Sequence, residues 1–108
     1  MANKISELTD YQKNINIEFI IVKLIDKNTT KDNDIVNTYL VADETGVIEA
    51  SVWNEDINVG DIIYFYDAYT SVFKEKRRLF MSGNGYLRRV GRIRKEFVEL
   101  ENEVINSS

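Results

Sequence analysis

The sequence contains no cysteine and no histidine among its 108 residues. Without cysteine it can form neither a disulfide framework nor a thiolate metal site. Without histidine it lacks the most common general base and the most common metal ligand. These two absences argue against a metal enzyme, and we expect no metal site and no cofactor.

Long apolar runs are missing as well. No segment approaches the roughly 18 apolar residues of a membrane span, and the first residues lack the apolar core of a secretory signal. Proline is absent, and no internal repeat or linker divides the chain. The length fits one domain, and 44% hydrophobic residues can supply an ordinary core. We therefore expect a soluble intracellular protein with no membrane partner.

Acidic residues outnumber basic ones, and the net charge of −4 by itself argues against a nucleic-acid partner. The charges are unevenly distributed, however. Residues 1–73 have a net charge of −8, whereas residues 74–95 contain nine basic residues and a single acidic one, Glu75. Because phosphate binding depends on the local field more than on the total charge, this basic segment is a candidate contact region. The alternative is that it is ordinary solvated surface.

Hydrophobic periodicity predicts an all-β protein, because apolar residues alternate with polar ones in short runs separated by turn residues. The expected strands are residues 15–25, 35–43, 47–53, 61–73 and 78–82. Residues 26–34 are predicted to form a loop and residues 83–85 a turn. The connection 54–60 is too short for a helix of normal length. Within the fourth strand the apolar alternation shifts at Asp67 and Ala68, which indicates a bulge.

The two ends of the chain are less regular. Residues 1–14 are predicted to be an arm or a short helix. The barrel domain is expected to span residues 15–100, although residues 86–100 fit both a strand and a helix. Residues 101–108 are polar and are expected to be frayed. Three apolar residues at helical spacing would close the core or, alternatively, contact a scaffold partner: Ile93, Phe97 and Leu100.

Side-chain alternation places four aromatic rings on the outside of the predicted sheet. In strand 47–53 the small and aliphatic residues fit the interior, so Trp53 points outward; the alternative is that Trp53 plugs one end of the barrel. By the same alternation Tyr69, Phe73 and Phe80 point outward. Large rings on a wet face favour a functional explanation.

Basic residues surround these rings, at and beside the predicted hairpin between the fourth and fifth strands. Rings beside cations suit a single-stranded nucleic acid, because every base has a π-face and every nucleotide has a phosphate. The candidate phosphate contacts are Lys74, Lys76, Arg77, Arg78 and Arg88, with Arg89 and Arg92 as alternatives.

Five strands, short turns and a basic hairpin match a five-stranded Greek-key barrel with short terminal extensions, of which the oligonucleotide-binding (OB) fold is the best known. The ligand face of that fold lies on strands two and three, and the loops after strands one and four close over it. The corresponding loops here are residues 26–34 and 74–77.

Four segments of the sequence resemble one family. They are Val-Ala-Asp-Glu-Thr-Gly-Val-Ile-Glu-Ala-Ser-Val-Trp-Asn-Glu-Asp (41–56), Gly-Asp-Ile-Ile (60–63), Tyr-Thr-Ser-Val-Phe-Lys (69–74) and Gly-Asn-Gly (83–85). They resemble the DNA-binding proteins of the sensor-of-single-stranded-DNA (SOSS) complex, which are simple proteins with a single barrel, over about residues 12–98. The resemblance implies an OB fold that binds single-stranded DNA in DNA repair and the DNA damage response.

The same resemblance implies that bases stack on Trp53, Tyr69, Phe73 and Phe80, the rings that alternation had placed outside. It also implies a scaffold protein shared with the Integrator complex as a protein partner. The expected location is the nucleus if the source is eukaryotic and the cytoplasm otherwise.

Other functions stay open. RNA is the nearest alternative, because stacking distinguishes sugars poorly and no motif for the 2′-hydroxyl is evident. A barrel used only for protein contacts is a second alternative. Catalysis would need a carboxylate pair such as Asp43-Glu44 or Glu55-Asp56, and adjacent carboxylates in turns are usually solvated or capping groups. We therefore predict a non-enzymatic protein without a small-molecule substrate.

Overall fold

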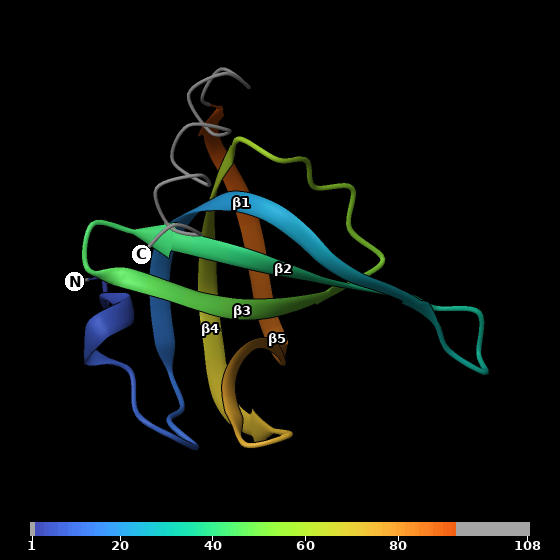
Figure 1. The fold of residues 1–108 in the computed structure, drawn as a ribbon, viewed down its shortest axis with the longest axis horizontal. Helices are drawn as coiled ribbons and strands as arrows, with labels where there is room; N and C mark the ends of the chain where they lie inside the picture. Colours follow the sequence, from blue (N-terminus) through green and yellow to red (C-terminus); the bar gives the residue numbers. More distant parts are fainter. Residues whose placement is uncertain (1, 93–108) are drawn as a thin grey trace.

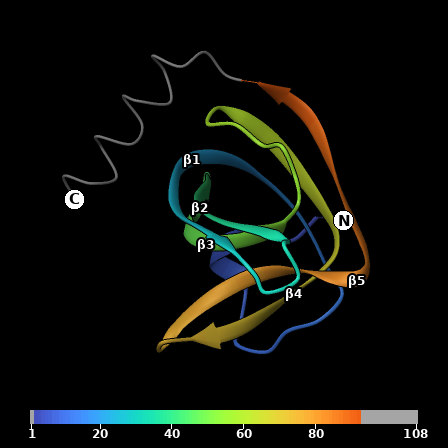
Figure 2. The same ribbon diagram turned by 90° about the vertical axis from the view of Figure 1, so that its right-hand side faces the viewer.

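Five β-strands close into a barrel in the computed structural model, which describes residues 2–92 (Figure 1). The strands are β1 (Ile15–Thr29), β2 (Ile35–Asp43), β3 (Gly46–Trp53), β4 (Asp61–Phe73) and β5 (Lys76–Arg92). Their order around the barrel is β1-β2-β3-β5-β4, and β4 closes it by pairing with β1 (Figure 2). The β3–β5 pair is parallel and the other four pairs are antiparallel. The predicted fold class is confirmed.

The core consists of the inward-facing residues of all five strands. Alternate residues of β1, from Ile15 to Ile21, are almost fully buried, as their spacing predicts. Phe19 and Phe65 meet edge to face with ring centroids 4.8 Å apart. Burying each such side chain contributes roughly 1.5–3 kcal/mol. Ile48, Ala50 and Val52 of β3 also point inward, which leaves the outer face of this strand to other residues.

The β1–β2 hairpin is longer than predicted and projects away from the barrel (Figure 1). Pairing continues from Asp26 opposite Thr38 to Thr29 opposite Ile35, so residues 26–29 of the expected loop 26–34 are strand and only residues 30–34 form the turn. The hydrophobic pattern stops at Ile25 because the projecting part has no core to cover, but backbone pairing does not require apolar side chains.

Strand β5 differs most from the prediction, which placed the fifth strand at residues 78–82. It runs unbroken through the expected turn at residues 83–85 and includes residues up to Arg92. A Cβ on Gly85 would lie 2.6 Å from the carbonyl oxygen of Tyr66, so this glycine permits a close approach of two backbones. The approach occurs beside the predicted bulge, where Asp67 has φ 57° and the β4–β5 register shifts.

The N-terminal segment covers one end of the barrel. It contains the short 3-10 helix η1 (Ile5–Glu7), where the Glu7 carboxylate accepts a hydrogen bond from the Lys4 backbone N–H at 2.8 Å. Ile5 and Leu8 are buried against the barrel. No helix within residues 2–92 has the length and apolar character needed to cross a lipid bilayer. The expectations for residues 93–108, including Ile93, Phe97 and Leu100, lie outside the described residues.

Candidate functional site

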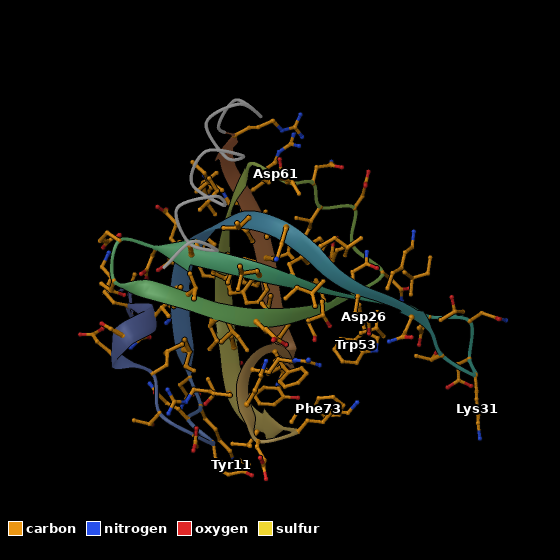
Figure 3. All side chains as sticks on the ribbon, viewed as in Figure 1. Tyr11, Asp26, Lys31, Trp53, Asp61 and Phe73 are labelled. Atoms are coloured by element: carbon orange, nitrogen blue, oxygen red, sulfur yellow. The ribbon has the colours of Figure 1, made fainter. Side chains whose placement is uncertain are left out.

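The four predicted rings gather on one side of the barrel. Tyr69 of β4 and Phe80 of β5 are direct cross-strand partners, and their rings stack with centroids 5.5 Å apart. The Trp53 ring lies 6.2 Å from that of Phe80. Trp53 and Phe73 are 45% and 46% exposed, and Figure 3 shows both on the side between the β1–β2 hairpin tip, marked by Lys31, and the β4–β5 hairpin. The outward alternation is confirmed, and Trp53 is no core plug.

Two local features fix these rings. β3 ends at Trp53, and Asn54 then ties this end to the start of β2: its side chain accepts a hydrogen bond from the Ile35 N–H at 2.9 Å and donates one to Asp34 at 3.0 Å. At the other hairpin, Lys74 and Glu75 both have positive φ, 51° and 67°. This is the two-residue turn that suits the twist of a hairpin, and it places Phe73 opposite Lys76.

Three of the predicted cations share the face of the rings. The Arg78 guanidinium lies 4.6 Å from the centroid of Phe73, and the Lys74 ammonium lies 5.4 Å from it. Arg78 also forms an ion pair with Glu49 of β3 at 2.8 Å, and Lys76 lies 3.8 Å from the same carboxylate. Glu49 therefore lowers the positive charge of this face.

Arg77 does not join them. Side chains alternate along β5, so Arg77 points to the opposite face of the hairpin from Arg78. There its Nε donates to the Asp10 carboxylate at 2.7 Å. The basic residues are close together along the chain. Successive side chains of a strand point to opposite faces, however, so Arg77 and Arg78 are separated in space.

Arg88 is also separate from the hairpin cations. It is exposed and lies opposite Tyr64 in the β4–β5 ladder. Arg89 and Arg92, the alternative phosphate contacts, lie 4.0 Å and 2.7 Å from the buried carboxylate of Asp61. Asp61 is at the end of the barrel away from Phe73 in Figure 3.

Three outward tyrosines were missed by the sequence analysis. The rings of Tyr64 and Tyr66 lie 4.5 Å apart, and Tyr66 stacks on Tyr86 at 4.3 Å with an interplanar angle of 15°. The alternation that puts Ile63 and Phe65 inward already implies that Tyr64 and Tyr66 point outward. Tyr86 could not be placed because the preceding glycines were expected to form a turn.

The carboxylate pair at the β2–β3 turn has a structural role. Asp43 accepts hydrogen bonds from the Thr45 hydroxyl at 2.6 Å and from the N–H groups of Ile5, Thr45 and Gly46. Burial alone would raise the pKa of Asp43, but these bonds outweigh it and hold the pKa below its ordinary value. Glu44 forms an ion pair with Lys4. Within residues 2–92, no group of three or more acidic side chains is arranged to hold a metal ion.

The fold and this arrangement of rings define an OB-fold protein. No protein-family model matches the sequence. Among solved structures, the OB domain of a Thermoplasma acidophilum protein is similar with a TM-score of 0.72 at 14% identity, covering 86% of this chain and 90% of that one. A domain of replication protein A from Methanococcus maripaludis gives 0.70 at 19% identity, covering 85% and 98%.

Fission yeast Pot1, in a crystal structure with single-stranded DNA, gives a TM-score of 0.62 at 12% identity and covers 98% of this chain and 48% of that one. Together these likenesses establish the OB fold of the chain.

Proposed function

We propose that this protein binds single-stranded DNA, without catalysing a reaction and with little sequence preference. The observation behind the proposal is the exposed face on which Trp53, Phe80, Tyr69 and Phe73 lie within reach of Lys74 and Arg78. Stacking on aromatic rings and contacts from cations to the backbone are the two components of single-strand binding by OB folds.

The geometry suits a strand that crosses the rings with its bases inward. Trp53, the Tyr69–Phe80 pair and Phe73 offer successive surfaces from the end of β3 to the tip of the β4–β5 hairpin. Lys74 and Lys76 lie at that tip, where they would meet phosphates. The similar fold of a replication protein A domain and of Pot1, which was crystallised with single-stranded DNA, supports this assignment.

We further propose that the chain is a relative of the DNA-binding proteins of the SOSS complex and acts in DNA repair, in the nucleus of a eukaryote or the cytoplasm of another cell, with a scaffold protein as its partner. The support is where the residues that carry this resemblance lie in the fold. Those of 41–56 include the turn held by Asp43 and the strand that presents Trp53, and those of 69–74 present Tyr69 and Phe73.

Titration of the Trp53 fluorescence tests the proposal, because this is the single tryptophan and its ring lies on the candidate surface. Single-stranded DNA should quench it, and duplex DNA of the same sequence should do so far less. No response to any strand would contradict the proposal and favour a barrel used for protein contacts. Competition between matched DNA and RNA strands then decides between the two nucleic acids, and a clear RNA preference would overturn the DNA assignment.

A further inference from the structure

A hollow opens beside the ring-bearing face, where β3 and β5 separate. The two strands pair only from Glu49 opposite Arg78 to Ser51 opposite Phe80. Beyond this point lies a hollow of about 320 Å³, lined by the rings of Trp53 and Tyr86, by Glu55, and by the apolar surface of Val52, Met81 and Leu87. Its volume is within the range of roughly 300–1,000 Å³ typical of small organic ligands.

One of the two aromatic walls of the hollow, Tyr86, is supported by a neighbouring ring. Tyr86 is 59% exposed, and one face of its ring stacks on Tyr66, which in turn contacts Tyr64. The other face of Tyr86 is therefore the one available to a ligand. Trp53 belongs both to this hollow and to the ring-bearing face, so a strand on that face continues directly into the hollow.

The charges beside the hollow specify how a nucleotide would enter. Within the described part of the chain, the Glu55 carboxylate has no hydrogen bond or ion pair with another side chain, so it would repel a phosphate. It can accept a hydrogen bond from the exocyclic amino group of a base, as acidic side chains do from cytosine. Thymine instead has carbonyl oxygens on both sides of its one N–H group.

Arg88 supplies the opposite charge. It follows Tyr86 by two residues on the same outer face of β5, roughly 7 Å along the strand. It is exposed, and its cross-strand partner is Tyr64. A nucleotide whose base entered the hollow would therefore have a cation for its phosphate on the outer surface and a carboxylate for its base inside.

We propose that this hollow is a base-selective subsite, which holds one further nucleotide between Trp53 and Tyr86 and prefers a base with an exocyclic amino group through Glu55, while Arg88 contacts its phosphate. The inference rests on the proposed function, because it concerns a nucleotide of the strand bound on the four rings. It assigns Arg88 a phosphate contact that is separate from those of the hairpin cations.

Binding of thymidine strands of increasing length, from about 4 to 16 nucleotides, tests the stacking half of the subsite. Tyr86→Ala should bind the shortest strands as wild type does and the longer ones about tenfold more weakly. Tyr86→Phe keeps the ring and should match wild type. Tyr11→Ala is the matched control, because it removes a more exposed tyrosine from the N-terminal arm, away from the hollow (Figure 3).

A single cytidine moved along a long thymidine strand tests the selectivity. Wild type should favour one position by about fivefold, and Glu55→Ala, which removes the acceptor on an exposed loop, should abolish that preference without shortening the footprint. Identical length curves for Tyr86→Ala and wild type, or a cytidine preference that survives in Glu55→Ala, would overturn the subsite while strand binding itself persisted. A wild-type protein that bound no strand would overturn the proposed function and the subsite together.

Discussion

The carboxylate of Glu49 and the guanidinium of Arg78 form an ion pair at 2.8 Å, and Arg78 at the same time lies over the ring of Phe73. Both side chains are only 18% exposed. A negative charge on β3 thus holds a cation of β5 against one of the rings proposed to bind DNA. Glu49 stabilises the arrangement of this face and also opposes the approach of phosphates.

Glu49→Gln should therefore have opposite effects on folding and on binding. It leaves Arg78 without its charged partner, because the amide offers at most a neutral hydrogen bond, and we expect the free energy of unfolding to fall by about 1–2 kcal/mol, less than for a fully buried pair. Affinity for single-stranded DNA should rise about threefold at low salt. The substitution removes the repulsion between one carboxylate and a phosphate, which at a separation of about 7 Å is roughly 0.6 kcal/mol in water. Urea unfolding and fluorescence titration measure the two effects.

The control for that experiment is Glu44→Gln, which makes the same charge change at the β2–β3 turn, where Glu44 pairs with Lys4. It should leave affinity nearly unchanged. A loss of affinity in Glu49→Gln would mean instead that Arg78 must be held against Phe73 for the strand to bind.

Phe73→Ala tests the rings. The side chain is 46% exposed and has little part in the core. We expect affinity for single-stranded DNA to fall at least about tenfold, since one stacked base contributes roughly 1–3 kcal/mol, with the thermal midpoint nearly unchanged. Tyr11→Ala, which also removes an exposed ring, should affect neither quantity. If Phe73→Ala unfolded the protein or bound normally, this face would be wrongly assigned.

Lys74 and Arg77 should differ in the salt dependence of binding, although they are neighbours at one hairpin. Within residues 2–92, Lys74 has no carboxylate within ion-pair distance, whereas Arg77 pairs with Asp10. For single strands the slope of log K against log salt changes by about 0.7 for each phosphate neutralised. Lys74→Ala should flatten the slope by about 0.7, and Arg77→Ala by much less, because Asp10 would need a new counterion whenever Arg77 bound a phosphate.

Titrations of a dye-labelled strand at several salt concentrations measure both slopes, with Trp53→Ala, which has no tryptophan signal of its own, as the control that lowers affinity without changing the slope. If Lys74→Ala and Arg77→Ala flattened the slope equally, the ion pair between Arg77 and Asp10 would have to open readily when a strand binds. An unchanged slope in Lys74→Ala would remove the hairpin tip from the phosphate path.

Two glycines of β5 should respond differently to alanine. A Cβ on Gly85 would lie 2.6 Å and 2.7 Å from the carbonyl oxygens of Tyr66 and Asp67, and one on Gly83 would meet nothing within 4 Å. We expect Gly85→Ala to lower the free energy of unfolding by about 1–3 kcal/mol and Gly83→Ala by no more than about 0.5 kcal/mol. Denaturant unfolding compares them, and equal stabilities would contradict the close approach of β4 and β5.

Acid should remove part of the stability through Asp43. Its pKa is lower in the folded state than in the unfolded state, so its contribution is complete above the unfolded value of about 3.9 and is lost as the pH falls through the folded value. Asp43→Asn should be about 1–2 kcal/mol less stable at neutral pH, because its amide would meet the Ile5 N–H that now donates to the carboxylate.

The stability difference between wild type and Asp43→Asn should narrow as the pH falls below about 4, which urea unfolding at a series of pH values measures. Asp32→Asn, which changes the net charge equally in the β1–β2 turn, controls for general charge effects. A difference that stayed constant with pH would show that the charge of Asp43 contributes nothing.

Much of the fold and half of the site followed from local rules. The bulge at Asp67, the inward side of β1 and the outward rings were predictable because a strand turns successive side chains to opposite faces whatever it pairs with. The turn predicted at residues 83–85 was wrong because glycine permits both a turn and a close backbone approach. Only the position of the Tyr66 carbonyl distinguishes these two uses.

The sequence by itself determined the alternation of side chains, and therefore a closed sheet whose outer face presents Trp53, Tyr69, Phe73 and Phe80. The tertiary structure alone decided which cations accompany these rings. Arg78 joins them through Glu49, 29 residues away, and Arg77 is drawn to Asp10, 67 residues away. An ion pair depends on how far apart two charges lie in space. The hydrophobic pattern that closes the barrel does not specify which charged surface residues become neighbours when it closes.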